Sequence, residues 1–372
     1  MAAIYIHVPF CQSRCIYCDF YSTTHSDEWK ERYVAALLRE IEDRRHDISH
    51  ARVHSIYMGG GTPSCLSPAH LARIYESLYE NYTVSPDAEV TIEANPDDVT
   101  SDWLSALRHT PVNRISMGVQ SLDNALLKFL RRRHTAEQAR SAVAACRQNG
   151  FDNVSVDLIY GLPGQTFSMW QADVSEILRW NVSHLSAYSL SFEEGTSLHR
   201  MLQQGMVEEC DEDVSLSMYR HLIAAASAAG MQHYEISNFA SPGFYSRHNH
   251  GYWTGVSYWG FGPGAHSYDG CALRRWNLSD LHSYVSYSPQ VPFESEILSE
   301  VERYNEFVMT RLRIREGADL SLLKPEDRNY CLRQAKGYLS TGKLSLRGNV
   351  LSLTPEGIFI SNIIMSDLMR EA

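Results

Sequence analysis

Short apolar runs alternate with helical segments along the first half of the chain. Six runs are rich in β-branched and aromatic residues and predict strands: AIYIHV, VHSIYM, AEVTIEA, NRISMGV, VSVDLIY and HLSAYSL. Between the runs, apolar residues recur at helical spacing; in the segment 27–45 they are Trp29, Tyr33, Leu37 and Ile41. This alternation predicts an α/β fold with a parallel sheet, either doubly wound or closed toward a barrel.

Five of the six predicted strands are followed directly by segments of unusual composition. In chain order these segments are PFCQSRC, GGGTP, EANP, GVQS and GLPGQT. The carboxyl ends of parallel strands meet at one edge of the sheet, where the loops converge on a single ligand site. We therefore expect one functional site that is built from five loops.

The pattern changes after about residue 237, where glycine and aromatic residues dominate without a clear period. From about residue 296 the spacing is helical again, and the last stretch predicts a short hairpin followed by a helix. We predict a barrel domain over 1–240, an aromatic and glycine-rich connecting segment over 241–290, and a small C-terminal domain over 291–372.

Composition excludes some classes of function. The 372 residues carry a formal net charge of −11, which argues against non-specific nucleic-acid binding. The longest stretch without Asp, Glu, Lys or Arg, 248–268, holds five glycines, so it does not predict a membrane-spanning helix. The N-terminus shows no secretory signal, and a cytoplasmic location is expected. In that reducing compartment, cysteines are metal ligands or buried thiols rather than disulfides.

Three cysteines lie within eight residues of each other, in the loop after the first predicted strand. Cys11, Cys15 and Cys18 have no second cysteine pair elsewhere in the chain that would complete a zinc site. Three thiolates match three corners of a [4Fe–4S] cluster and leave one iron open to a small-molecule ligand. The remaining cysteines are predicted to be buried hydrophobic residues without a functional role: Cys65, Cys146, Cys210, Cys271 and Cys331.

The CxxxCxxC motif after a first strand resembles the signature of the radical SAM superfamily. That resemblance implies S-adenosylmethionine (SAM) bound at the open iron, and a partial (β/α)6 barrel. The triplet Gly59-Gly60-Gly61 before Thr62-Pro63 resembles the glycine motif that contacts SAM in this superfamily, because glycine lets backbone groups approach a ligand closely. A tight strand-to-helix turn explains the triplet equally well.

Several motifs of this chain resemble one particular family within that superfamily. Tyr5-Ile-His-Val-Pro-Phe-Cys11, GGGTP, EANP, MGVQS and DLIYGLPGQT resemble, in order, the oxygen-independent coproporphyrinogen oxidase (HemN-like) family. The resemblance also implies a small helical, winged-helix-like C-terminal domain. It assigns SAM contacts to Tyr5, Tyr17, Gly60, Gly61, Thr62, Glu93, Gln120, Arg132 and Asp157. Glu93 as a helix-flanking acid and Arg132 as part of a solvated helix end stay open as alternatives, as does the presence of one or two SAM molecules.

Two departures separate this chain from the oxidases of that family. Phe20 stands where they carry a fourth cysteine, and they have a longer N-terminal extension. The segment HNHGYW instead resembles the HNxxYW motif of the family's heme-chaperone branch, which implies heme contacts from His248, Asn249, Tyr252 and Trp253. Imidazole is a common axial ligand of heme iron, and aromatic rings pack on a porphyrin face. His250 and His266 are alternative ligands, and the aromatics could instead only cover the barrel mouth.

The branch resemblance implies heme-accepting apoproteins as partners, with respiratory-chain proteins as one class. Whether the protein is an enzyme stays open, and no catalytic residue is assigned. Two alternatives remain, both implied by the same resemblance: coproporphyrinogen III oxidation, and anaerobic heme degradation by SAM-dependent methyl transfer. Homodimer formation and peripheral contact with a membrane stay open as well, although no amphipathic segment predicts membrane binding.

Overall fold

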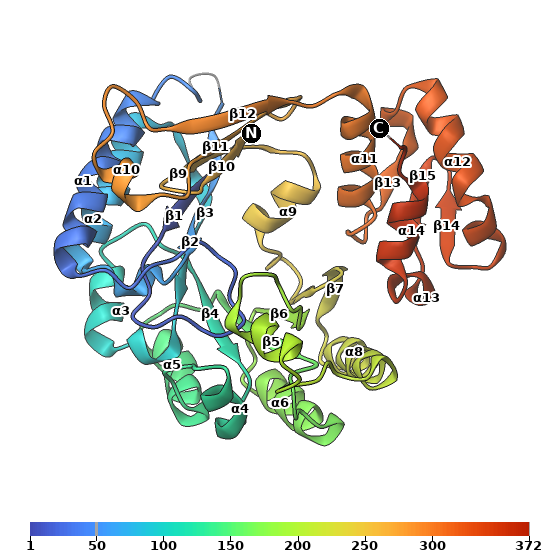
Figure 1. The fold of residues 1–372 in the computed structure, drawn as a ribbon, viewed down its shortest axis with the longest axis horizontal. Helices are drawn as coiled ribbons and strands as arrows, with labels where there is room; N and C mark the ends of the chain where they lie inside the picture. The colour runs from blue at the N-terminus through green and yellow to red at the C-terminus, as the bar shows by residue number, and fades with distance from the viewer. Residues whose placement is uncertain (49–50, 372) are drawn as a thin grey trace.

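The computed structural model describes residues 1–48 and 51–371. Its centre is a curved sheet in which six parallel strands are neighbours in chain order (Figure 1). These strands are β1 (Ala2–Val8), β2 (Val53–Gly60), β3 (Val84–Ala94), β4 (Arg114–Gln120), β5 (Val154–Tyr160) and β6 (His184–Ser189). Nearly every residue of β1 and β5 is buried, because parallel strands are covered on both faces.

Helices connect the parallel strands and follow the outer face of the curved sheet (Figure 1). They are α1 (Asp27–Asp43), α2 (Pro68–Asn81), α3 (Ser101–Leu107), α4 (Asn124–Phe129), α5 (Ala136–Gln148) and α6 (Phe167–Arg179), with short 3-10 helices η1 (Pro63–Cys65) and η2 (Pro96–Asp98). On α1, the predicted apolar stripe is buried at Tyr33, Leu37 and Ile41. Helices on one face and six strands in order confirm the predicted partial (β/α)6 barrel.

Shorter elements extend the sheet at both edges. Beside β6 lie two antiparallel strands, β8 (Asn238–Ala240) and β7 (Gln232–Glu235), preceded by α7 (Ser197–Gln203) and α8 (Glu212–Ala228). On the other edge, β9 (Ser257–Phe261) pairs in parallel with β1. The edge continues with β10 (His266–Tyr268), β11 (Leu273–Asn277) and β12 (Phe293–Ile297), all antiparallel, while α9 (Arg247–Trp253) and α10 (Leu281–Val285) lie between strands. The aromatic segment thus contributes to the same sheet.

The C-terminal part has a hydrophobic core of its own. It contains α11 (Glu300–Arg311), β13 (Ala318–Asp319), η3 (Leu320–Leu322), α12 (Pro325–Ser340), β14 (Leu344–Arg347), β15 (Val350–Leu353), α13 (Pro355–Ile358) and α14 (Ser361–Leu368). A three-stranded sheet, β13-β15-β14, accompanies the helices, so the predicted hairpin and final helix are present. Helix α9 contacts both β2 and α11 and so joins the two parts. Among the described residues, no helix is long and apolar enough to cross a membrane.

Candidate functional site

Hydrogen bonds tie the loops at the carboxyl ends of the strands to one another. The backbone N–H of Gly61 donates to the carbonyl of Val8 at 2.8 Å, and that of Thr62 donates to the carbonyl of Phe10 at 2.7 Å. Farther along the same edge, Arg132 donates through Nη2 to Asn95 Oδ1 and to the Gly118 carbonyl. The structure therefore brings together the loops that the sequence placed at one site.

The three clustered cysteines are free and partly exposed in the loop after β1. Thr62 Oγ1 donates to Cys11 Sγ at 3.5 Å, and Arg132 Nη1 donates to Cys15 Sγ at 3.4 Å. Burial, together with the neighbouring Cys15 and Cys11, raises the pKa of the Cys18 thiol to about 11. Thiols this close repel one another once ionised, and a bound cation would relieve that repulsion.

The five remaining cysteines differ in their surroundings. Cys146 and Cys331 are buried, as predicted, whereas Cys65 and Cys210 are half-buried. For Cys271 the prediction is wrong, because this residue is exposed in the turn between β10 and β11. Its backbone N–H donates to Asp269 Oδ1 at 2.8 Å, so the turn and not a core fixes its position.

The glycine triplet is required by close packing inside the protein. A Cβ atom at Gly60, where φ is +106°, would lie 2.6 Å from the ring of His7. A Cβ at Gly61 would lie 2.6 Å from the carbonyl oxygen of Phe10, and one at Gly59 would lie 2.8 Å from the carboxyl carbon of Glu93. The space beside these glycines is thus occupied by neighbouring loops, which explains the triplet without a ligand.

Two carboxylates occupy partly buried positions, Glu93 near the end of β3 and Asp157 in the middle of β5. Glu93 accepts hydrogen bonds from the Tyr57 hydroxyl at 2.7 Å and from the Gly60 N–H at 3.2 Å. Burial, together with the charge of Asp157, raises the pKa of Glu93 to about 7, and burial raises the pKa of Asp157 to about 6. The Nε of nearby Arg114 is buried without a hydrogen-bond partner. Such carboxylates suit a ligand that brings an ammonium group or hydroxyl donors.

Backbone irregularity and burial mark Gln120 and Arg132. Gln120 has a φ of +69°, and the pairing of β4 with β5 shifts register beside it. A non-glycine residue in this region is rare and turns its side chain away from the regular strand direction. Arg132 is partly buried against Cys15, and its Nε has no hydrogen-bond partner. A guanidinium with a free donor beside a thiol is suited to hold an anionic group.

Two tyrosines complete the predicted SAM set. The Tyr5 hydroxyl lies 3.0 Å from His7 Nδ1, and its ring stacks on Tyr57 with centroids 6.3 Å apart. Tyr17 lies close to Cys15 and Arg132. Of the nine residues predicted to contact SAM, Tyr5 and Asp157 lie in the middle of β1 and β5, and the other seven lie at the ends of strands or in the segments that follow them. Tyr5 also faces a larger cavity.

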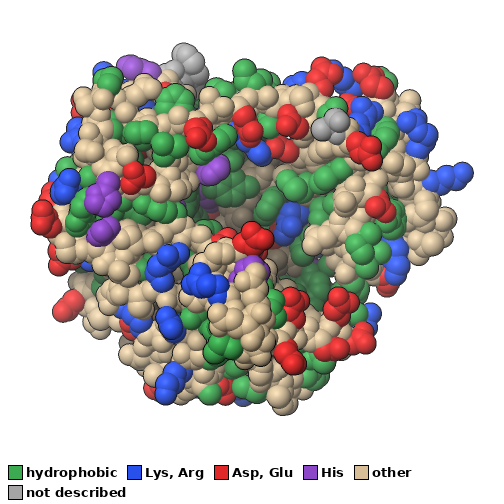
Figure 2. Space-filling model, in the orientation of Figure 1, with side chains coloured by type: hydrophobic (Ala, Val, Ile, Leu, Met, Phe, Trp, Pro, Cys, Tyr) green, Lys and Arg blue, Asp and Glu red, His purple; other side chains and the backbone are tan. Residues whose placement is uncertain are grey.

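That cavity, of about 1110 Å³, opens between the cysteine loop, the β9–β10 turn and α11. Figure 2 shows the hollow in the face of the molecule, with hydrophobic side chains in its wall. Asn249, Tyr252 and Trp253 line it, and Trp253 Nε1 is a buried donor without a partner. Arg14 and Arg303 line it as well, and both are exposed.

His248, the first residue of the HNxxYW motif, does not line the cavity. It is 2% exposed, with Nδ1 at 3.0 Å from Ser55 Oγ and Nε2 at 2.9 Å from the Tyr252 hydroxyl. Its backbone N–H donates to Glu89 Oε1 at 3.1 Å. Burial lowers the pKa of the imidazole to about 3, so the ring is neutral. Both ring nitrogens are thus engaged within the protein, and binding of heme by this motif stays a prediction.

Sequence reasoning missed several residues that hold this arrangement. Ser55 and Glu89 fix His248 from neighbouring strands, and nothing in their local sequence indicates it. Glu40 in the last turn of α1 and Arg44 directly after the helix form a buried ion pair at 2.9 Å. Glu40 could have been found, because it follows Leu37 by three residues and so falls on the apolar face of the helix.

The donor set fits an iron–sulfur cluster. Within 1–48 and 51–371, no three His, Cys, Asp or Glu side chains converge closely enough to hold a single metal ion. A [4Fe–4S] cluster places its thiolates at separate corners of a cube, so this finding does not count against it. Three thiols in one loop, with a guanidinium beside one of them, supply the ligands and a positive charge to balance them.

Comparison with known proteins places the chain in a family. The Radical SAM superfamily profile matches residues 5–177, and the HemN C-terminal domain profile matches 298–360. A protein of Mycobacterium tuberculosis (strain H37Rv) named "Heme chaperone HemW" is 35% identical over 98% of this chain and 94% of its own length. A Lactococcus lactis protein of that name is 36% identical over 84% and 82%.

Among solved structures, coproporphyrinogen III oxidase (HemN) from Escherichia coli matches with a TM-score of 0.86, covering 99% of this chain and 90% of its own. At 22% identity this likeness shows a common fold. The radical SAM family implies a [4Fe–4S] cluster and SAM. The chain therefore belongs to the radical SAM superfamily and, within it, to the HemN-like family that includes the HemW proteins.

Proposed function

We propose that this protein binds heme in the 1110 Å³ cavity and delivers it to acceptor proteins, while it holds a [4Fe–4S] cluster and SAM at the strand ends. The proposal rests on the volume of this cavity and on the residues that line it. It exceeds the roughly 300–1,000 Å³ of pockets for drug-sized ligands, and a porphyrin is larger than such ligands. Tyr252, Tyr258 and Trp253 offer flat apolar surface, and the exposed Arg14 and Arg303 offer partners for propionates.

Residues of the strand-end loops would bind the cluster and SAM. Cys11, Cys15 and Cys18 hold the cluster, which when bound supplies one-electron chemistry toward SAM. Arg132, with its unpartnered Nε, binds the carboxylate of SAM beside Cys15. Glu93 accepts from the amino group of SAM, because a positive charge there lets the carboxylate ionise at neutral pH.

Delivery is favoured over catalysis by two observations. The Mycobacterium tuberculosis relative named HemW matches along nearly the full chain, and Phe20, 62% exposed at the cavity wall, occupies the fourth-cysteine position of the oxidases. Coproporphyrinogen III oxidation remains the second candidate, because Glu93, Asp157 and Arg114 preserve a charged barrel interior next to the loops. SAM-dependent methyl transfer to heme with ring opening is a third.

One experiment separates these functions. Protein reconstituted anaerobically is incubated with SAM, a reductant, heme and coproporphyrinogen III. The masses of the recovered tetrapyrroles are then measured by mass spectrometry. Heme of unchanged mass, retained by the protein and released to a heme-free acceptor protein, is the expected result. Loss of two carboxyl groups from coproporphyrinogen III would make the protein an oxidase. A methylated or opened heme would make it a degrading enzyme.

The matched control replaces Cys11, Cys15 and Cys18 together with alanine. This variant is expected to lose its iron and sulfide, because the chain offers no other thiol in the same loop. Unchanged iron and sulfide content after anaerobic reconstitution would refute the cluster site. If the mass of heme or coproporphyrinogen III still changes with this variant, the change cannot come from the radical SAM site.

A further inference from the structure

Two of the histidines at the cavity are already engaged by the protein. His7 lies in its wall, but Nδ1 is 3.0 Å from the Tyr5 hydroxyl and Nε2 is 2.9 Å from the Tyr21 carbonyl. His248 is buried behind the wall with both nitrogens bonded, as described above. A heme iron needs a free imidazole nitrogen, so neither ring can coordinate without giving up one of its two hydrogen bonds.

His266 differs from both. Its side chain lines the cavity and is exposed, and its ring nitrogens hydrogen-bond to no other residue that the structure describes. The ring lies nearly parallel to that of Trp276, at 19° with centroids 5.7 Å apart. Stacking of this kind fixes the plane of an imidazole without using its nitrogens. The neighbouring His250 does not line the cavity and faces Glu316 at 3.6 Å.

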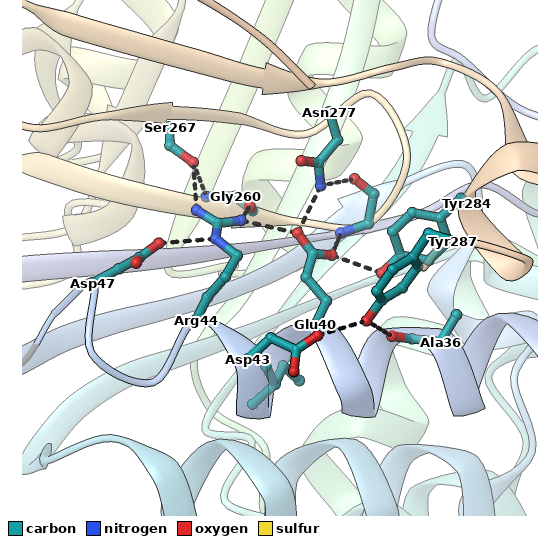
Figure 3. Close-up of polar contacts among 12 residues, drawn as sticks. Ala36, Glu40, Asp43, Arg44, Asp47, Gly260, Ser267, Asn277, Tyr284 and Tyr287 are labelled. Carbon is teal, nitrogen blue, oxygen red and sulfur yellow. Dashed lines mark hydrogen bonds and ion pairs between the residues drawn. The ribbon is translucent and has the colours of Figure 1, made fainter. Parts of the chain in front are cut away.

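A buried network holds the backbone on both sides of His266 (Figure 3). Arg44 donates through Nη1 to the Gly260 carbonyl at 2.7 Å and through Nη2 to Ser267 Oγ at 3.2 Å. Glu40 Oε2 accepts from the Gly262 N–H at 2.9 Å. The network therefore clamps the end of β9 and the start of β10, between which the chain turns toward the cavity.

Close packing also restricts the backbone of the turn between β9 and β10. A Cβ at Gly260 would lie 2.2 Å from the His266 carbonyl oxygen, and one at Gly262, where φ is +100°, would lie 2.4 Å from the His7 carbonyl oxygen. Asn277 Nδ2 bridges Glu40 Oε1 at 2.7 Å and the Gly262 carbonyl at 2.9 Å. A ligand on a backbone fixed in this way is pre-organised, which lowers the entropic cost of binding.

We infer that His266 is the axial ligand of the bound heme, presented to the cavity by the Glu40–Arg44 clamp. The inference rests on the proposed heme binding and adds the atom that binds the iron. An imidazole nitrogen donates its lone pair to the iron, and no electron transfer or proton release is required. In this arrangement His248 acts as a positioning residue that fixes Tyr252 in the cavity wall.

The test compares His266→Ala, His248→Ala and His109→Ala in the full-length, anaerobically reconstituted protein. His109 is exposed after α3 and lies outside the cavity, so its variant controls for loss of any surface imidazole. Each protein is titrated with ferric heme and followed by absorption and electron paramagnetic resonance spectra. We expect His266→Ala to lose the histidine-ligated spectrum and at least about tenfold in heme affinity, while His109→Ala matches the unaltered protein.

Added imidazole distinguishes a lost ligand from a damaged fold. In His266→Ala it should restore the ligated spectrum, because a free imidazole can occupy the vacated position. If the unaltered protein binds heme and His266→Ala keeps its spectrum, the inference is wrong while the proposed function stands. Loss and imidazole rescue in His248→Ala alone would assign the iron to His248 instead. If the unaltered protein shows no saturable heme binding, the proposed function itself fails.

Discussion

Replacing Glu40 with alanine tests the clamp in the core of the protein. The Glu40 carboxylate is 1% exposed and accepts from Arg44, Gly262, Asn277 and Tyr284 at distances of 2.7–2.9 Å. Its removal leaves the Arg44 guanidinium, which is only 7% exposed, with Asp47 at 2.9 Å as its remaining ion-pair partner. Breaking one side of a buried ion pair costs about 3–5 kcal/mol, a large share of the roughly 5–15 kcal/mol that stabilises a typical protein.

The assay is urea unfolding followed by tryptophan fluorescence, with Glu31→Ala as the matched control. Glu31 is on the same helix and pairs with Arg73 and His70, but its side chain is 54% exposed. An exposed pair contributes only about 0–1 kcal/mol, so the control should change the free energy of unfolding by no more than that. Equal effects of Glu40→Ala and Glu31→Ala would refute the reasoning from burial.

A second variant isolates the ion pair from the packing around it. In the double substitution Glu40→Met with Arg44→Met, no buried charge is left unpaired, because Asp47, the other partner of Arg44, is 36% exposed. The protein should therefore be more stable than with either single change. A double variant whose loss equals the sum of the two single losses would show that the pair is not coupled. In that case the hydrogen bonds of Glu40 to Gly262 and Asn277 would carry the effect.

Two further perturbations follow from the site. Ser55→Ala removes the partner of His248 Nδ1 and should lower the free energy of unfolding by about 1–3 kcal/mol, whereas the exposed Ser217→Ala should be neutral in the same urea titration. Burial raises the pKa of Glu93 from 4.5 to about 7, so folding binds a proton, and stability contributed by that proton is lost as the pH rises through this range. Glu93→Gln should therefore raise the thermal midpoint, relative to the unaltered protein, more at about pH 8 than at about pH 5; an equal change at both would contradict this.

The parallel strands could be predicted because burial on both faces leaves continuous apolar runs in the sequence. All six predicted strands are present, and the first, AIYIHV, lies within β1. Strand β9 was not predicted, because its five residues, Ser257–Phe261, are short and interrupted by Gly260. Its pairing with β1 joins residues about 255 positions apart, and only that tertiary contact makes the segment a strand.

The HNxxYW motif shows where prediction from local sequence stops. The spacing of His248 and Tyr252 places them one helical turn apart, which agrees with their contact in α9. The second partner of His248, Ser55, lies 193 residues away, so the sequence alone left both ring nitrogens free to bind iron. The exposed His266 carries no strong local signal, because its proposed role depends on a turn that Glu40 and Arg44 hold from the C-terminal end of α1.

The cysteine loop connects the two parts of the proposed site. Arg14 and Phe20 line the cavity of about 1110 Å³ in which heme binding is proposed, and between them in sequence Cys15 contacts Arg132. A cluster held by Cys15 and Cys18 would restrict the loop and thereby order this cavity wall. Heme binding would then cost less conformational entropy than in protein without the cluster. We therefore expect protein stripped of its cluster with a chelator to bind heme several-fold more weakly than reconstituted protein, measured by heme titration at equal salt concentration. Equal affinity in both forms would show that the cluster and the heme cavity act independently.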